Sequence, residues 1–416
     1  MKKILVFLIV LSVALSLFAS GATEDGGYKG VTNNAFTTSL SADSDSLSYK
    51  LHVSPASLAE NRLIVEFPSV AVDGYNVAKS ISKHSVAEAV SELLRFKFTK
   101  KNLVTVAVGM LENIGSGYNS VASTTVEAGV AIKNFAFGVD GVVNVRTMPG
   151  FKHGTETPIN QDIETLADYQ PQGLGNTGVV PVIDIAATAA YGMKVLEFGS
   201  NYLAAGASVR FVKRTYLTQI SACSIVEDGL KIDEKEARAG FAVPVDLDAV
   251  LGVLNGDVKV SVSATNLNGY YYMQKYDNYK DALSNKNGNS KYTVYTPWSL
   301  NLGVELTHKW AFFEPKLTVR FDNILGFIRN DVKTYGYADS KVEIFKYLTF
   351  RADLRIVRFI KLNAAFRKGY LEFGGALDFY GNTIELAYGY HEAGASYGAK
   401  PVDTLTLRIK FGFDNN

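Results

Sequence analysis

The chain has 416 residues, a formal net charge of +1 at pH 7 and a single cysteine, Cys223. A nearly neutral chain has no excess positive charge for a polyanion, so we expect no nucleic-acid partner. One thiol excludes an internal disulfide and a cysteine-based metal centre, and we expect neither a metal nor a cofactor. The content of 36 Gly, 23 Tyr and 24 Phe favours β structure.

The first 22 residues have the pattern of an export signal. Lys2 and Lys3 precede the apolar run 4–18, and the small residues 19–22 follow it. This order predicts a secretory signal peptide over 1–22. A membrane-anchoring helix is the alternative, but the run is shorter than the roughly 20 residues that a spanning helix needs. No comparable apolar run follows, which excludes a helical membrane protein.

The strongest signal along the rest of the chain is a period of two. In 404–413, apolar residues alternate with Thr404, Thr406, Arg408, Lys410 and Gly412. Successive side chains of a strand point to opposite faces, so this segment predicts a strand with one apolar face. Its length is that of a tilted membrane-spanning strand. The same alternation recurs in 257–265, 300–307, 316–322, 350–356 and 371–379.

We expect an all-β fold, a transmembrane antiparallel β-barrel of about 14 strands, over 61–413. A soluble β-sandwich also alternates, but the strands are long and their connections are short and long in turn, which favours an outer-membrane barrel. An even strand number places both termini in the periplasm, with outer-membrane lipid and the barrel-assembly machinery as partners. The predicted strands are 61–72, 120–132, 135–147, 181–193, 201–212, 239–252, 257–266, 297–308, 315–325, 342–357, 361–367, 370–379, 383–390 and 403–413.

A barrel of this size has room for an insert. We expect the Ser- and Asp-rich segment 23–60 to fold into the lumen as a hatch, or else to be a disordered periplasmic tail. A short helix is predicted over 76–98, between the first two strands, because Ser85 and Glu88 form a capping-box pattern. The long connections are expected at 74–118, 149–180, 213–238, 268–296, 326–341 and 391–402.

The polar positions of the alternation place equal numbers of cations and anions inside the barrel. Such a lining suggests ion pairs across the lumen and argues against a strongly ion-selective pore; alternatively, the charges only solvate the wall. The principal charges are Arg320, Asp322, Arg351, Asp353, Arg355, Glu385, Arg408 and Lys410. The same rows hold Glu127, Asp140, Arg146, Arg210, Lys259, Glu305, Glu372 and Asp378.

No catalytic motif is present, and we expect no enzyme activity. The five histidines form no His-Glu-x-x-His pair, and no nucleophile elbow or phosphate-binding loop occurs. Only His391, expected in an outer loop beside Glu392, is a candidate for a membrane-embedded hydrolase. Trp298 and Trp310 bracket one strand, as interfacial aromatics do. Tyr270, Tyr271 and Tyr272 fit the same role, although a ligand site in a loop is also possible.

Two segments resemble FadL-type outer-membrane proteins, which include long-chain fatty acid transporters and related TraF-type and spirochaetal barrels. Ser54, Pro55 and Ala56, followed by 62–68, look like the Asn-Pro-Ala segment that opens the first strand of that family, and 258–267 resembles its strand ending in Asn-Leu. The resemblance implies a fourteen-stranded barrel with an N-terminal hatch and passive uptake of small hydrophobic molecules such as fatty acids. The alternative is a non-transporting structural barrel of an envelope or conjugation system.

Overall fold

A computed structural model gives the fold of the chain. The predicted signal peptide and, apart from Glu88, the predicted helix at 76–98 lie outside the residues that the structure describes. The described residues are 44–60, 63–75, 88, 119–147, 178–217, 220–221, 236–296, 298–308, 310, 313–329, 344–357, 359–367, 369–379, 382–392 and 401–414.

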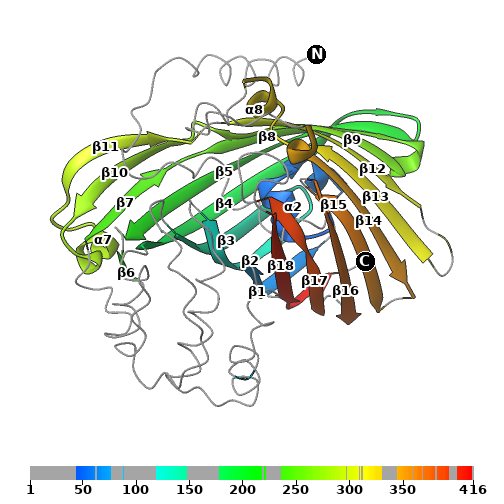
Figure 1. Ribbon diagram of the computed structural model, residues 1–416. Helices are drawn as coiled ribbons and strands as arrows, with labels where there is room; N and C mark the ends of the chain where they lie inside the picture. The colour runs from blue at the N-terminus through cyan, green and yellow to red at the C-terminus, as the bar shows by residue number, and fades with distance from the viewer. Residues whose placement is uncertain are drawn as a thin grey trace.

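The strands form one closed antiparallel barrel (Figure 1). The last long strand pairs with the first, Val70 with Ile409 and Tyr75 with Thr404, so the sheet closes on itself. The strands are β1 (Ile64–Tyr75), β2 (Asn119–Ile132), β3 (Phe135–Thr147), β4 (Gly178–Phe198), β5 (Asn201–Leu217), β6 (Ile220–Ser221), β7 (Ala237–Ala242), β8 (Val245–Val253), β9 (Val258–Leu267), β10 (Tyr270–Tyr276), β11 (Asn289–Tyr295), β12 (Ser299–Thr307), β13 (Phe313–Phe321), β14 (Leu348–Ile356), β15 (Ile360–Arg367), β16 (Tyr370–Phe379), β17 (Asn382–Glu392), β18 (Pro401–Lys410) and β19 (Gly412–Asp414).

In four places one strand of the barrel is broken into two consecutive pieces: β7 and β8, β9 and β10, β11 and β12, and β18 and β19. Counted this way, the barrel has 14 strands, as predicted, and the two-residue β6 only adds to the end of β4. Pro244 explains the first interruption, because it has no N–H to give to the sheet. Its carbonyl still accepts from the Arg210 N–H at 3.0 Å.

Short helices complete the described fold. They are α2 (Leu47–His52), η2 (Pro55–Glu60), η4 (Leu254–Gly256), α7 (Tyr279–Ser284), α8 (Ile324–Arg329) and η5 (Ile344–Tyr347). Within the described residues, no helix has both the length and the apolar composition to cross a membrane.

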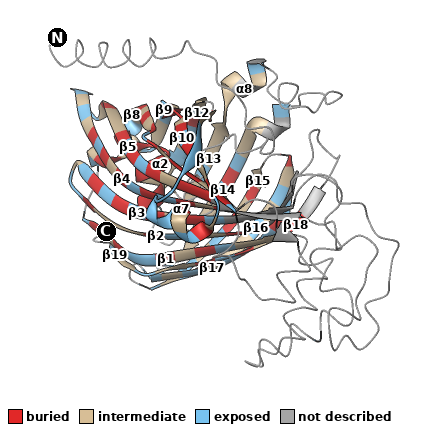
Figure 2. Ribbon diagram, turned by 90° about the vertical axis from the view of Figure 1, so that its left-hand side faces the viewer, coloured by how far each residue is buried: buried red, intermediate tan, exposed pale blue. Residues whose placement is uncertain are grey.

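The wall alternates as the sequence predicts. On β17, Ile384 and Leu386 are each 54 % exposed, while Glu385 between them pairs with Arg408 of β18, which is buried. Figure 2 shows the same alternation of buried and exposed residues along β3, β4 and β5. Carbon-rich side chains therefore cover the outside and charges lie inside, which is the reverse of a water-soluble protein. The outward rows include Phe137, Val139, Val209, Phe211, Val260, Val262, Leu302, Val304, Leu362, Phe373 and Leu407.

The wall is taller on one side than on the other. β4 has 21 residues and β5 has 17, whereas β15 has 8 and β16 has 10. β4 and β5 are longer than the 9–11 residues that cross a bilayer. β7 pairs with the last residues of β5, β10 pairs with β7, and β11 pairs with β10. Figure 1 shows these strands reaching beyond the others. The long connections predicted at 213–238 and 268–296 are therefore wrong in part. Their strand residues escape the pattern because a strand outside the bilayer need not carry an apolar outer face.

The remaining boundaries differ by a few residues. The predicted strands 135–147 and 370–379 match β3 and β16. The first strand begins at Ile64, three residues later than predicted, and β14 begins at Leu348 because 344–347 form the 3₁₀ helix η5. The tail beyond Lys410 continues as β19 after a break at Phe411.

The outward rows generate a first prediction. Leu386→Arg should lower the free energy of unfolding by about 2–4 kcal/mol in phospholipid vesicles, because it places a guanidinium in hydrocarbon. Leu386→Phe, which keeps the position apolar, is the control. Urea titrations of the refolded protein measure both. A change for Leu386→Arg within roughly 0.5 kcal/mol, as is usual at a water-exposed site, would contradict a lipid-facing wall.

Candidate functional site in the barrel lumen

The N-terminal residues 44–60 lie inside the ring of strands. Figure 1 shows α2 enclosed by the barrel, and η2 packs against β4, β5 and β8. Leu47, Leu51 and Leu58 are fully buried and pack with inward-facing alanines of β2, β3 and β4. The Ser46 hydroxyl caps α2 by accepting from the Tyr49 N–H at 3.1 Å. The apolar side chains of the segment thus form a hydrophobic core together with side chains of the barrel wall.

Two glycine pairs make this close approach possible. Gly129 of β2 lies opposite Gly138 of β3, and Gly192 of β4 lies opposite Gly206 of β5. A Cβ on Gly138 would lie 2.5 Å from the Leu51 Cδ1 atom, and a Cβ on Gly206 would lie 2.1 Å from the Ala56 nitrogen. Any larger residue would push α2 or η2 off the wall. The glycines therefore form two shallow seats, one for each short helix.

Asp248 of β8 holds the segment Ser54–Ala56 in the second seat. Its Oδ2 accepts from the Ser54 hydroxyl at 2.6 Å, and its Oδ1 accepts from the Ala56 N–H at 2.8 Å. All of these groups are buried, and Pro55 packs its carbonyl over Gly192. Hydrogen bonds to a charged acceptor are the stronger kind. Ser54 and Ala56 therefore hold this part of the N-terminal segment against β8.

Ion pairs join the same segment to other parts of the wall. Lys316 of β13 binds Asp45 at 2.7 Å, and Lys259 of β9 binds Glu60 at 3.0 Å. Burial alone would raise the pKa of Glu60, but Lys259 and the Tyr202 hydroxyl outweigh it and lower that pKa below its usual range. Glu66 of β1 also accepts a hydrogen bond from the Leu47 N–H of α2. The segment therefore contacts strands around the ring. It thus crosses the lumen near the short turns.

The predicted lumen charges lie inside and are paired. Arg320 binds Asp322, and Arg351 binds Asp353, each at 2.7 Å, and Lys410 binds Glu66 at 2.6 Å. These partners lie on the same strand, at its end, or on the neighbouring strand, so the pairs run along the wall and not across the lumen. The others are Arg355 with Glu314 and Asp378, and Arg408 with Glu372 and Glu385.

Two buried pairs lie on the taller side, and of their members the sequence analysis names only Arg210. Arg214 of β5 binds Asp184 of β4 through two hydrogen bonds of 2.7 and 2.8 Å. Arg210 makes a similar two-point contact with Asp246, which also accepts from the Ser208 hydroxyl at 3.0 Å. The alternation predicts an inward position for both acids, because Asp184 and Asp246 lie on the same face of β4 and β8 as other buried residues.

An apolar cluster lies beyond these pairs, inside the taller side. It consists of Val142, Val182, Ala186, Val212, Ala242, Tyr271 and Met273, with Tyr292 and Val294 packed against it. Tyr271 is 3 % exposed, and the Arg214 Cζ lies 4.1 Å from its ring centroid. The prediction that Tyr271 is an interfacial aromatic is therefore wrong, although its neighbour Tyr272 is exposed. β10 thus presses apolar side chains against the inner faces of β3, β4 and β5.

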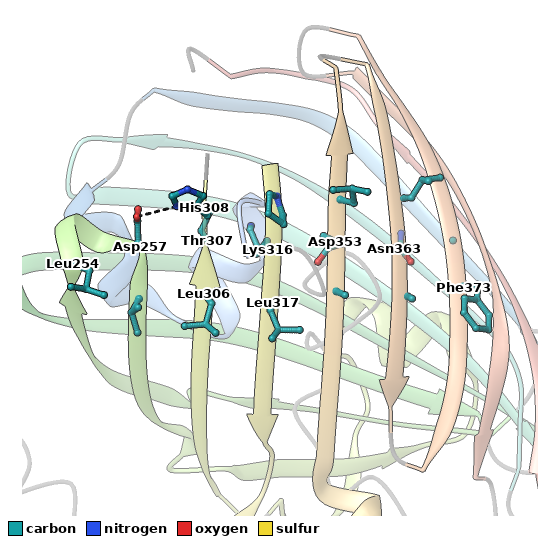
Figure 3. Close-up of a pocket in the computed structure, with 17 residues that line it drawn as sticks. Leu254, Asp257, Leu306, Thr307, His308, Lys316, Leu317, Asp353, Asn363 and Phe373 are labelled. Atoms are coloured by element: carbon teal, nitrogen blue, oxygen red, sulfur yellow. Dashed lines mark ion pairs between the residues drawn. The ribbon is translucent and has the colours of Figure 1, made fainter. Parts of the chain in front are cut away.

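A pocket lies on the outer wall of the barrel (Figure 3). It has a volume of about 870 Å³ and crosses β9 and β12–β16 near the short turns. Its apolar lining comes from outward rows, such as Leu306, Leu317 and Phe373, so it faces the surroundings of the barrel and not the lumen. His308 at its rim binds Asp257 at 3.6 Å, and both side chains are exposed.

Two predictions about polar chemistry change. His391 and Glu392 are the last residues of β17. The prediction that His391, the hydrolase candidate, lies in an outer loop is therefore wrong. Among the described residues, one group could hold a metal ion, although none was expected: His52, Glu127 and Asp140. The sequence gives no sign of it, because His52 is far from the two acids along the chain.

No protein-family model and no curated protein matches the sequence. Solved structures similar to this chain include the toluene transporter TodX of Pseudomonas putida, with 10 % identity, a TM-score of 0.43, and coverage of 94 % of this chain and 99 % of that chain. The toluene transporter TbuX of Ralstonia pickettii has 9 % identity, a TM-score of 0.40, and coverage of 86 % and 92 %. A Pseudomonas aeruginosa FadL homologue has 10 % identity, a TM-score of 0.38, and coverage of 94 % and 100 %.

The glycine seats generate a second prediction. Gly206→Val should loosen the N-terminal segment, because overpacking costs about 1–3 kcal/mol. In a Cys223→Ser background, Ser57→Cys reports on the segment through its rate of labelling by a water-soluble maleimide, and we expect that rate to rise roughly fivefold or more. Gly141→Val is the matched control, since a Cβ there meets nothing within 4 Å. Equal labelling rates in both variants would show that the seat does not hold the segment.

Proposed function

We propose that this protein is an outer-membrane channel for the passive uptake of small hydrophobic molecules, with the segment 23–60 as its hatch. The observation that carries the proposal is the apolar cluster around Tyr271 and Met273, inside a barrel whose inward rows are otherwise rich in paired charges. Burial of an apolar solute there gains about 25 cal/mol per Å² of surface removed from water. The cluster is therefore a site for solutes that partition out of water.

The wall supports this choice over an ion channel. The charges of the lumen are of both signs and bind one another, as Arg351 with Asp353 and Arg408 with Glu385. An ion-selective pore needs a ring of one sign. Neutral solutes meet no such barrier, and Met273 can adapt its flexible side chain to different shapes. The substrate class is therefore small and apolar, and fatty acids fall within it, as the resemblance to FadL-type proteins implies.

Passage requires a movement in this proposal. Residues 44–60 block the lumen near the short turns, and β10 packs the apolar cluster closed on the taller side. We infer that a solute first enters the cluster and that release of the N-terminal segment from Asp248 then opens the way. Both termini lie in the periplasm in this arrangement, with the short turns on the same side. The barrel-assembly machinery and outer-membrane lipid are the expected partners.

A second candidate function is a non-transporting barrel of an envelope or conjugation assembly. The observation that favours it is the taller side, where the 21-residue β4 and its neighbours extend beyond the length that a bilayer needs. Such an extension offers a platform for a partner. Pull-down from intact membranes separates the two functions: a stable stoichiometric partner, with unchanged uptake in a strain lacking the protein, favours assembly.

The apolar cluster generates a third prediction. Met273→Gln places an amide among apolar side chains, at a cost of about 1–3 kcal/mol, and should slow the uptake of an apolar solute by roughly fivefold or more. Initial rates with a radiolabelled monoaromatic hydrocarbon and a radiolabelled long-chain fatty acid, in a strain lacking the native protein, measure the effect. Tyr272→Gln is the control, because that neighbour is exposed. Unchanged rates for Met273→Gln, at equal amounts of folded barrel, would refute passage through the cluster.

A further inference from the structure

Two acidic residues face each other on the inner wall. Glu127 of β2 lies directly opposite Asp140 of β3 in the sheet, and both side chains point into the lumen. They are 1 % and 2 % exposed. Like charges directly opposite in a sheet destabilise it, and buried carboxylates are costly unless a cation or a proton neutralises them. The pair therefore requires a partner.

The N-terminal segment brings a third ligating group to this pair. His52 is the last residue of α2, and its Nε2 lies 3.1 Å from the Asp140 Oδ1. Gly129, two residues after Glu127 on β2, and Gly138, two residues before Asp140 on β3, give Leu47 and Leu51 their seat. The packing of α2 thus fixes the end of the helix over the two carboxylates. One atom of each side chain lies within 4.8 Å of the other two.

Glu127 has an unsatisfied side chain that points into this group. Within the described residues, both of its carboxylate oxygens are buried and neither accepts a hydrogen bond of good geometry; the Ser48 hydroxyl is a neighbour that makes at most a weak one. Asp140 is held in place differently, because its Oδ2 accepts from the Thr188 hydroxyl at 3.2 Å while Oδ1 stays directed at His52. Such an outer hydrogen bond orients a ligating carboxylate. A buried, unsatisfied carboxylate beside an imidazole is the setting of a cation site.

We propose that His52, Glu127 and Asp140 bind a divalent transition-metal ion that fastens the N-terminal segment to the barrel wall. The two carboxylates cancel the charge of the ion, and the imidazole favours a zinc-like ion over Mg²⁺ or Ca²⁺. Ligands at about 2.0–2.2 Å in a tetrahedron are roughly 3.3 Å apart. The 3.1 Å between His52 and Asp140 already fits that spacing. The Glu127 carboxylate lies within 4.8 Å of both.

This inference does not depend on the passage of any solute. The ion links residues of β2 and β3 to α2, so it strengthens the first glycine seat, whereas Asp248 serves the second one. Its effect is on how firmly the segment is held. A shared proton between the two acids is the competing explanation, and the experiment separates the two.

The test uses Zn²⁺ alone and the refolded full-length protein, first stripped with a chelator. Isothermal titration should show one site per chain, and Glu127→Gln and His52→Gln should each weaken it by roughly tenfold or more, since each removes a ligand. Glu385→Gln is the matched control, because that carboxylate also lies in the lumen but pairs with Arg408. Its affinity for Zn²⁺ should equal that of the parent.

A second measurement covers the folding of the variants. Heat-modifiable migration on a gel confirms that each barrel is folded, and thermal unfolding with and without Zn²⁺ should show a higher midpoint for the parent and for Glu385→Gln only. Binding of less than one ion per chain by the parent, or equal affinity in Glu127→Gln, would overturn the proposal. Either result would assign the site to proton sharing instead.

Discussion

The close approach of residues 44–60 to the inner wall is the contact on which the rest of the structure depends. Paired glycines on neighbouring strands, Gly129 with Gly138 and Gly192 with Gly206, remove the side chains that would otherwise keep the segment away. Asp248 then satisfies the polar groups of the second seat. Without these positions the segment would lose the contacts that hold it against the inner wall.

The wall itself obeys one constraint, that each strand must suit two surroundings at once. Outward rows carry leucine, valine and phenylalanine, and inward rows carry charges that bind a neighbour along the wall. Buried ion pairs gain little stability against hydrocarbon of the same size, but removal of one partner is costly. These paired charges contrast with the apolar cluster around Tyr271, which receives the hydrophobic solute in the proposed function.

The sequence predicts the barrel because the bilayer imposes a regular pattern on each crossing. Strands β3 and β16 match their predicted bounds, and Arg408 and Glu385 form an ion pair between neighbouring strands. The pattern ends where the bilayer ends, so the sequence predicts a loop where β10 and β11 lie and an interfacial ring at the buried Tyr271. Contacts between distant segments carry no local signal. Ser54 and Asp248 are 194 residues apart, and His52 meets Asp140 only after the fold has formed.

The most direct test of the account is the conductance of the barrel without its N-terminal segment. Deletion of 23–60 leaves every strand in place, and heat-modifiable migration on a gel verifies that the shortened barrel is folded. If the segment closes the lumen, planar bilayers should show a higher single-channel conductance for the deletion variant than for the full-length protein. An unchanged conductance would contradict the claim that residues 44–60 fill the lumen.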